Sequence, residues 1–102
     1  MNGESPKEIG GIKVIAYAIV KSENKHTGNT KQIVAGETKG AATAMIIAQY
    51  ENDSSYYVFG CYSNEWEFET DTLHEDIDDA LKQLDWEYEN LSKNIVWYAK
   101  PE

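Results

Sequence analysis

Cysteine and arginine are the residue types in which this chain of 102 residues is poorest. Cys61 is the single cysteine, and none of the nine basic side chains is an arginine. One cysteine excludes an internal disulfide framework and a cysteine-based metal site. No run approaches the roughly 20 apolar residues of a membrane span, and residues 1–11 lack the apolar segment of a signal peptide. We therefore predict a cytoplasmic protein.

The composition is that of one globular domain. Hydrophobic residues make up 41% of the chain, and twelve side chains are aromatic, which is too apolar for a disordered segment. A chain of this length can bury a core of its own without disulfides or metals. Residues 1–11 contain three glycines and a proline and have little to bury. We predict a flexible arm there and a single domain over 12–102.

Negative charge is concentrated in the second half of the chain. Residues 1–50 carry six lysines and four acidic residues, a net +2, whereas residues 51–102 carry three lysines and fourteen acidic residues, a net −11. The whole chain has a net charge of −9. Such a field repels nucleic acids and anionic membranes and attracts cationic surfaces. We therefore predict a basic protein as the partner, and neither nucleic acid nor membrane.

The stretch from Glu65 to Asp71 alternates strictly between acidic side chains and Trp66, Phe68 and Thr70. Side chains of a strand point alternately to its two faces, so this pattern predicts a strand with its aromatic side chains buried. The other face then carries a row of carboxylates in water. That row either keeps the surface solvated or receives a basic partner or a divalent cation.

A helical pattern begins directly after this strand. Thr72 and Glu75 have the spacing of a capping box, in which each side chain binds a free backbone amide of the first turn. The apolar residues that follow recur at helical spacing and predict one stripe packed on the sheet, formed by Ile77, Ala80, Leu81, Leu84, Tyr88 and Leu91.

Trp86 lies outside that stripe, nearly opposite Ile77 at about 100° per residue. Two interpretations stay open. Either another segment of the chain, such as the C-terminal strand or the N-terminal arm, covers this end of the helix, or Trp86 contacts a partner.

Two strands are predicted in the first half of the chain. The segment Ile12 to Lys21 is rich in Ile, Val and Tyr and apolar on both faces, as a central strand would be. The segment Thr30 to Glu37 is predicted to pair with it as a hairpin.

Further strands are predicted before and after the acidic stretch. Alanines within 40–50 favour a helix, but the turn residues at 51–54 favour a strand from about Thr43 to Tyr50. The segment Ser55 to Tyr62 follows as another strand, and Ile95 to Ala99 forms a short last one. The predicted fold is α+β, an antiparallel meander of about five strands with one long helix packed on a face and a short C-terminal strand.

A catalytic site would need a nucleophile, a base and an orienting group within reach of one another. Cys61, His74 and Asp71 are the plausible trio. An acidic surrounding raises the pKa of a thiol, which favours a buried core cysteine over a nucleophile. His74 is expected to hydrogen-bond to Asp71 or to the preceding strand. We predict that the protein is not an enzyme.

The acidic residues also do not match a known metal site. Carboxylates at i and i+2 of a flat strand lie about 6.6 Å apart, too far to converge on a cation. No calcium-loop, zinc or phosphate-cradling glycine motif is present. We predict neither a metal nor a cofactor.

Part of the second half resembles a group of known proteins. The runs Tyr56–Cys61 and Asp71–Ala80, together with Trp66 and the pair Glu87–Tyr88, resemble the carboxy-terminal half of small stand-alone bacterial proteins of unknown function. Some of those proteins have the size and acidity of immunity proteins, which neutralise toxin partners. The resemblance covers residues 56–90 and implies a strand–strand–helix order; it carries no activity to transfer.

Three functional hypotheses follow. The first is a non-catalytic acidic domain that binds, and in an immunity-type role inhibits, a basic partner such as a nuclease. Its exposed contact residues are predicted to be Glu65, Glu67, Glu69, Asp79, Trp86, Glu87 and Glu89. The second is a homodimer that binds a small ligand between sheet and helix, in a pocket formed by Tyr57, Phe59, Trp66, His74 and Trp97. The third is an enzyme that uses His74 with Cys61 or Asp71.

Overall fold

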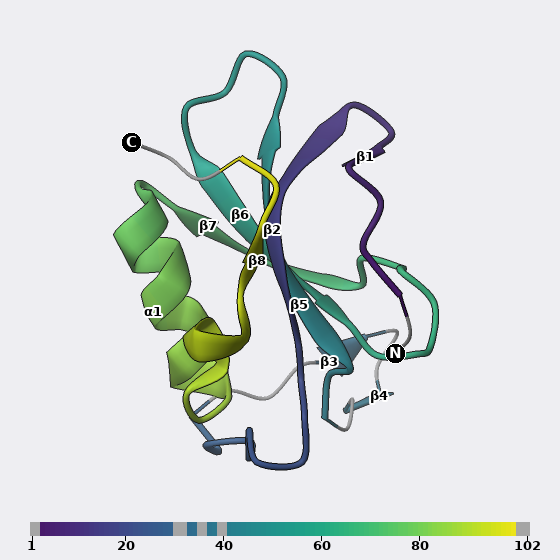
Figure 1. Ribbon diagram of the computed structural model, residues 1–102, viewed down its shortest axis with the longest axis vertical. Helices are drawn as coiled ribbons and strands as arrows, with labels where there is room; N and C mark the ends of the chain where they lie inside the picture. Colours follow the sequence, from purple (N-terminus) through teal and green to yellow (C-terminus); the bar gives the residue numbers. More distant parts are fainter. Residues whose placement is uncertain (1–2, 30–32, 35–36, 39–40, 100–102) are drawn as a thin grey trace.

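The computed structural model describes residues 3–29, 33–34, 37–38 and 41–99 (Figure 1). Its strands are β1 (Glu8–Ile9), β2 (Ile12–Ile19), β3 (Ile33–Val34), β4 (Glu37–Thr38), β5 (Ala44–Tyr50), β6 (Tyr56–Cys61), β7 (Thr70–His74) and β8 (Val96–Trp97). Its helices are α1 (Ile77–Glu87) and the short 3-10 helix η1 (Leu91–Asn94).

Five strands form an antiparallel meander in the order β1, β2, β5, β6 and β7. The helix α1 packs against one face of this sheet, and β8 pairs with β2 (Figure 1). These features confirm the predicted α+β class, the meander, the single long helix and the short C-terminal strand. Part of the segment predicted to be an arm belongs to the sheet, because β1 pairs with the start of β2.

The two edges of the sheet differ. Since β5 pairs along the full length of β2, both β1 and β8 must lie on the other side of β2. These two short strands therefore share one edge of the sheet. At the opposite edge, β7 pairs with β6 and with no other strand among the described residues.

The predicted hairpin between 12–21 and 30–37 is wrong. Its first strand, β2, pairs instead with β5. Within 30–37, the described residues belong to β3 and β4, which pair with each other, and the other residues of that range lie outside the described part. The reason is burial: a central position needs a segment that is apolar on both faces, and Ala44–Ala48 are all buried.

A β-bulge allows β2 to contribute to two hydrophobic cores. The register shifts between Val14 and Ala16, so Ile15 and Ala16 both point toward α1, while Val14 and Tyr17 point to the other face. The backbone carbonyl of Ile15 accepts hydrogen bonds from the amides of the two residues that follow β8, Tyr98 and Ala99. The bulge thus explains how one strand is apolar on both sides.

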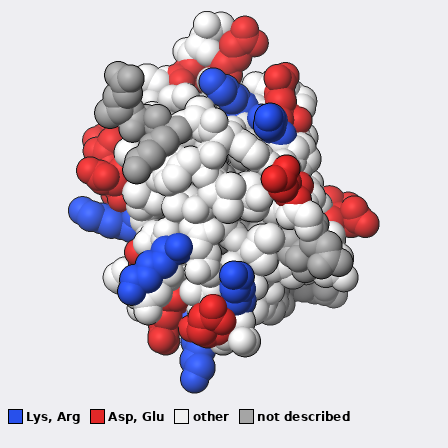
Figure 2. Space-filling view, viewed as in Figure 1, with Lys and Arg blue, Asp and Glu red and all other residues white. Residues whose placement is uncertain are grey.

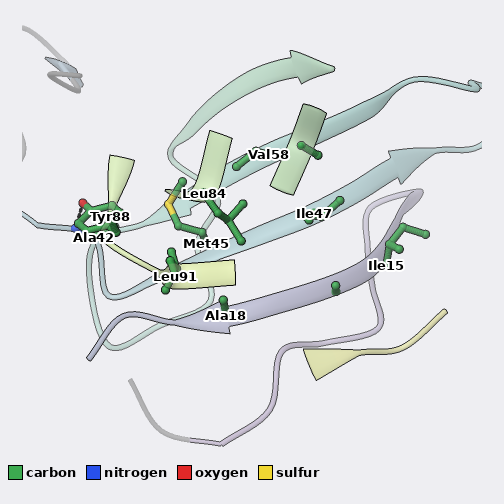
Figure 3. Packing of buried hydrophobic residues seen from close by; sticks show 11 residues of the cluster. Ile15, Ala18, Ala42, Met45, Ile47, Val58, Leu84, Tyr88 and Leu91 are labelled. Carbon is green, nitrogen blue, oxygen red and sulfur yellow. Dashed lines mark hydrogen bonds between the residues drawn. The ribbon is translucent and has the colours of Figure 1, made fainter. Parts of the chain in front are cut away.

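One core lies between the sheet and the helices (Figure 3). Met45, Ile47 and Val58 of the sheet meet Leu84 of α1 and Leu91 of η1, and all five side chains are buried. The other core lies on the opposite face and is built around Val14, Tyr17, Ile46, Phe59 and Cys61.

The predicted strand over 65–71 is misplaced. The strand β7 starts at Thr70, and residues 66–69 have no strand pairing. Trp66 and Phe68 are nevertheless half-buried against the second core, where Trp66 meets Tyr17 edge to face at 5.4 Å and Phe68 stacks on Phe59 at 4.9 Å. The alternation therefore predicted which side chains point inward, but this segment covers the sheet as a loop.

The predicted capping box is also wrong, because Thr72 lies within β7. The N-cap of α1 is Asp76, whose carboxylate accepts a hydrogen bond from the amide of Asp79 at 2.8 Å. The predicted stripe holds in outline: Ala80 and Leu84 are buried on α1, and Tyr88 is buried directly after its end.

Candidate protein-binding surface

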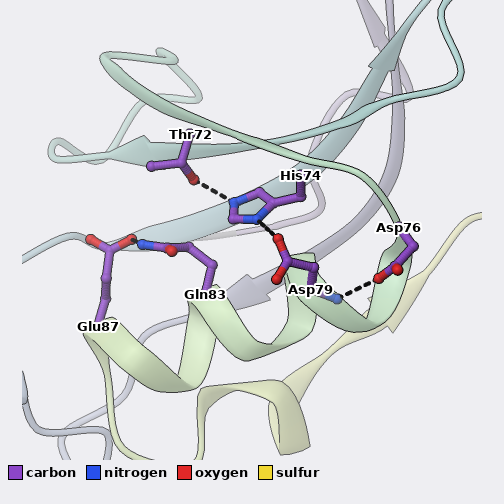
Figure 4. Close-up of polar contacts among 6 residues, drawn as sticks. All are labelled: Thr72, His74, Asp76, Asp79, Gln83 and Glu87. Atoms are coloured by element: carbon purple, nitrogen blue, oxygen red, sulfur yellow. Dashed lines mark hydrogen bonds and ion pairs between the residues drawn. The ribbon is translucent and has the colours of Figure 1, made fainter.

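Thr72, His74 and Asp79 form a hydrogen-bonded seam between the edge strand β7 and α1 (Figure 4). The Asp79 carboxylate lies 2.6 Å from Nδ1 of His74, and the Thr72 hydroxyl lies 2.7 Å from Nε2. Since an ionised carboxylate only accepts, Nδ1 carries the hydrogen of the first contact. In the neutral imidazole the Thr72 hydroxyl then donates to Nε2.

This seam fixes the position of β7. His74 is only 6% exposed, whereas the side chain of Asp79 is 57% exposed. The imidazole therefore joins a buried sheet position to an accessible helix position. The predicted hydrogen bond between His74 and Asp71 is wrong. Asp71 lies opposite Phe59 in the strand pairing and so points to the other face of the sheet from His74. The partner on the other ring nitrogen, Thr72, belongs to the same strand as His74.

The predicted catalytic trio does not come together. Cys61 lies at the end of β6, whereas His74 pairs with Tyr56 at its start, about 16 Å away at the rise of a strand. Cys61 also belongs to the core on the other face. Burial, with a smaller contribution from Glu69 and Glu67, raises the pKa of the Cys61 thiol to about 12. The thiolate needed for nucleophilic attack is therefore disfavoured.

The residues of the predicted ligand pocket are divided between the two faces of the sheet. Tyr57, Phe59 and Trp66 pack on the face away from α1. Trp97 packs with the core on the helix side, and His74 points toward α1. These five residues therefore do not line one pocket between sheet and helix, and the predicted pocket is wrong.

The predicted acidic contact residues have different environments. Glu65, Glu67 and Glu89 are exposed. Glu69 is half-buried and interacts within the fold, and Asp79 is exposed but bound to His74.

Glu87 was predicted to be exposed, and this is wrong, because the side chain is only 2% exposed. Gln83 donates a hydrogen bond of 2.9 Å from Nε2 to the Glu87 carboxylate (Figure 4). Glu87 follows Ala80 by seven residues and Leu84 by three, so it lies beside the buried stripe of α1. Helical spacing could have predicted this position.

Trp86 is a surface residue, with 54% of its area exposed. The loop before β3 reaches its backbone rather than its indole: the Thr27 hydroxyl and the Asn29 amide both donate to the Trp86 carbonyl. Trp86 follows Asp79 by seven residues and so lies on the same flank of α1, two turns further along. The loop that contains Thr27 and Asn29 therefore covers the backbone at this end of the helix, but it leaves the indole more than half exposed.

Leu73 was not predicted as a contact residue, and it is 62% exposed on the edge strand β7. Beside it, a hollow of about 570 Å³ is lined by Ser55, Leu73, Glu75, Asp76 and Asp79. We call the exposed side chains around this edge the β7–α1 surface, formed by Asp71, Leu73, Glu75, Asp76, Asp78, Asp79 and Trp86.

Within the described part of the chain, no lysine of the first half forms an ion pair with a carboxylate of the β7–α1 surface. Among the described residues, no lysine lies in an ion pair with a carboxylate, and the pair His74–Asp79 joins groups of the surface itself. Acidic side chains appear at the left rim of Figure 2, over the start of α1, with a lysine directly below them. The centre of the face in that view, over β2 and β8, is free of charge among its described residues.

A second hollow was also missed from the sequence, because distant segments form it. A groove of about 820 Å³ lies between the turn after β1 and the turn after β5. Charges of both signs line it: the lysines Lys7 and Lys13, and the acidic residues Glu8, Glu51 and Asp53. The mixed charge gives this groove no preference for a ligand of one sign.

Comparison with protein-family models, with curated proteins and with solved structures finds no match to this chain. The resemblance to immunity-type proteins therefore stays a prediction. In the described part of the chain, no helix has the length and apolar character needed to cross a membrane. The same residues contain no group of three or more His, Cys, Asp or Glu side chains placed to hold a metal ion.

Proposed function

We propose that this protein is a binding domain for a basic protein and that the β7–α1 surface is its contact surface. One observation carries the proposal: an open strand edge lies beside carboxylates that form no ion pair with any described lysine. Two exposed hydrophobic side chains, Leu73 and Trp86, lie among those carboxylates. Apolar anchors surrounded by charge are a common composition of protein-binding surfaces.

In its more specific form, the partner is a basic enzyme such as a nuclease, and binding inhibits it. The carboxylates of the β7–α1 surface can occupy a basic site that otherwise receives phosphates, because carboxylates and phosphates are both anionic oxygen acceptors. The net charge of −9 also accelerates the encounter with a basic partner at low salt.

Calorimetric titration with a short peptide of alternating lysine and valine tests the proposal. The surface variant carries Glu75→Lys and Asp78→Lys, and the matched control carries Glu8→Lys and Glu23→Lys. All four residues are exposed, and Glu8 lies on the opposite edge of the sheet. Each double variant changes the net charge from −9 to −5, because each replacement adds two charges.

The expected result is that the surface variant loses about tenfold or more of the affinity, whereas the control loses only the smaller share due to net charge. Equal losses in the two variants would mean that no particular surface binds the peptide. That result, or the absence of any binding to the unaltered protein, contradicts the proposed function.

A further inference from the structure

We infer that the partner binds by strand addition, as an extended basic segment that hydrogen-bonds to the free edge of β7. This inference rests on the proposed function and specifies its mode of binding. Its starting point is the asymmetry of the sheet: β1 and β8 occupy one edge, and no described strand occupies the other.

Among the described residues, the edge of β7 lacks several of the devices that usually prevent strand addition. Proteins protect such edges with lysine, proline, bulges or a covering segment. The five residues of β7, Thr70–His74, include neither lysine nor proline, and their register with β6 has no shift. Alternate residues of such a strand direct their N–H and C=O groups outward, ready to pair with another strand.

The edge is also held rigidly, which lowers the entropy cost of adding a strand. Thr72 and His74 point toward α1, where Asp79 binds the imidazole at 2.6 Å. On the other face, Leu73 lies across from Tyr57, whose ring meets that of Tyr50 at 4.9 Å. The side chains of β7 that face the helix therefore hold the strand in place, whereas Leu73 on the other face stays exposed.

Charge decides what the added strand contains. An incoming strand would run beside Asp71 and Leu73, with Glu75 and Asp76 at its end. Lysine suits this site, because its aliphatic stem can cover Leu73 while its ammonium group reaches a carboxylate. An extended segment in which basic and apolar residues alternate is therefore the expected occupant.

The same charges disfavour a second copy of this chain. Antiparallel pairing of two β7 strands about Thr72 would place Glu69 opposite Glu75 at both ends of the ladder. The acidic flanks thus act against self-association while they attract a basic strand.

Two versions of the lysine–valine peptide test this inference. One is unmodified, and the other is N-methylated at every interior amide, which keeps its charge and side chains but removes its backbone donors. We expect the methylated peptide to bind about tenfold or more weaker. We also expect the unmodified peptide to slow hydrogen exchange at outward amides of Thr70–His74.

A matched pair of protein variants tests which edge of the sheet binds the peptide. Leu73→Lys and Val96→Lys make the same change at exposed hydrophobic residues of opposite edges. Only the variant in β7 is expected to weaken binding of the unmodified peptide.

The outcomes separate the two levels of the proposal. If both peptides bind equally well and exchange within β7 is unchanged, strand addition is wrong, although a basic partner can still bind through side chains. If neither peptide binds, the proposed function fails as well.

Discussion

At the scale of single residues, two positions inside the fold hold polar side chains among apolar neighbours. Glu87 is buried beside Leu84, and His74 is buried between β7 and α1. Each has a partner: Gln83 donates to the Glu87 carboxylate, and Thr72 and Asp79 bind the two ring nitrogens of His74. Buried polar groups are tolerated because these hydrogen bonds replace those made with water.

The N-cap gives the first prediction. Replacing Asp76 with Ala removes the acceptor for the amide of Asp79 and should lower the free energy of unfolding by about 1 kcal/mol. Asp78→Ala is the control, since Asp78 is an exposed carboxylate of the same first turn with no capping bond among the described contacts. Urea unfolding measures the free energy of unfolding of both variants. Equal values would mean that Asp76 does not cap α1.

Alkaline pH gives the second prediction. Burial raises the pKa of Cys61 and of Tyr62 to about 12. In the unfolded chain these groups lose their protons near pH 8.5 and 10, roughly. Between those values and pH 12 the folded state holds more protons, so the free energy of unfolding should fall as the pH rises. The stabilisation is fully present below about pH 8 and is lost through this window.

Urea unfolding between pH 7 and 11, roughly, checks the sign of this dependence. Cys61→Ala removes one of the two groups and should make the decline shallower, whatever it does to the stability at pH 7. If the free energy of unfolding falls with pH as steeply as in the unaltered protein, the raised pKa of the Cys61 thiol is contradicted.

At the scale of elements, α1 is held to the sheet by one side and leaves the other in water. Leu84 is fully buried between β5, β6 and η1, whereas Trp86, two residues later, is more than half exposed. Helical periodicity separates the two positions by about 200°. The stability of the helix should therefore depend on Leu84 and not on the larger Trp86.

This contrast gives the third prediction. Leu84→Ala should cost about 2–5 kcal/mol of unfolding free energy, because it leaves a cavity in the core. Trp86→Ala should change stability by roughly 0.5 kcal/mol or less, as expected for a surface position. A large loss for Trp86→Ala in chemical unfolding would mean that the indole is structural and would remove it from the contact surface.

Elements also show what the sequence could and could not predict. The alternation after Glu65 predicted that Trp66 and Phe68 point inward, but it could not distinguish a paired strand from a loop lying on the sheet. The spacing of Thr72 and Glu75 predicted a cap at Thr72, whereas the structure has Asp76 as the N-cap. The choice is made by pairing, because β7 continues to His74 opposite Tyr56.

The candidate surface was predicted only in part for the same reason. Asp79 and Trp86 could be placed on a helix from their spacing. Leu73 could not be recognised as an edge residue, because edges depend on the order of strands across the whole sheet. That order differs from the predicted one, in which 30–37 stood beside 12–21.

At the scale of the whole molecule, a net charge of −9 is spread over a small fold. Among the described residues, no lysine lies in an ion pair with a carboxylate, so the exposed carboxylates of this part of the chain repel one another. Repulsion of this kind destabilises a compact state and is screened by salt.

The fourth prediction is that salt stabilises the protein. Raising sodium chloride from about 0.02 to 0.5 M should raise the midpoint of thermal unfolding by several degrees, because the Debye length falls well below the spacing of the exposed carboxylates. Calorimetry provides the measurement, with the variant Glu75→Lys/Asp78→Lys expected to respond less. A midpoint that falls with salt would indicate that attractive pairs dominate the fold.

The central claim is that a basic segment binds at the β7–α1 surface, and mapping the binding site by NMR tests it most directly. Isotope-labelled protein is titrated with the unmodified lysine–valine peptide while backbone amides and tryptophan indoles are followed. The account predicts that the largest shifts fall within Thr70–Asp79 and at the indole of Trp86. Shifts concentrated at Lys7, Lys13 and Tyr50 around the groove, or along β1 and β8, would contradict it.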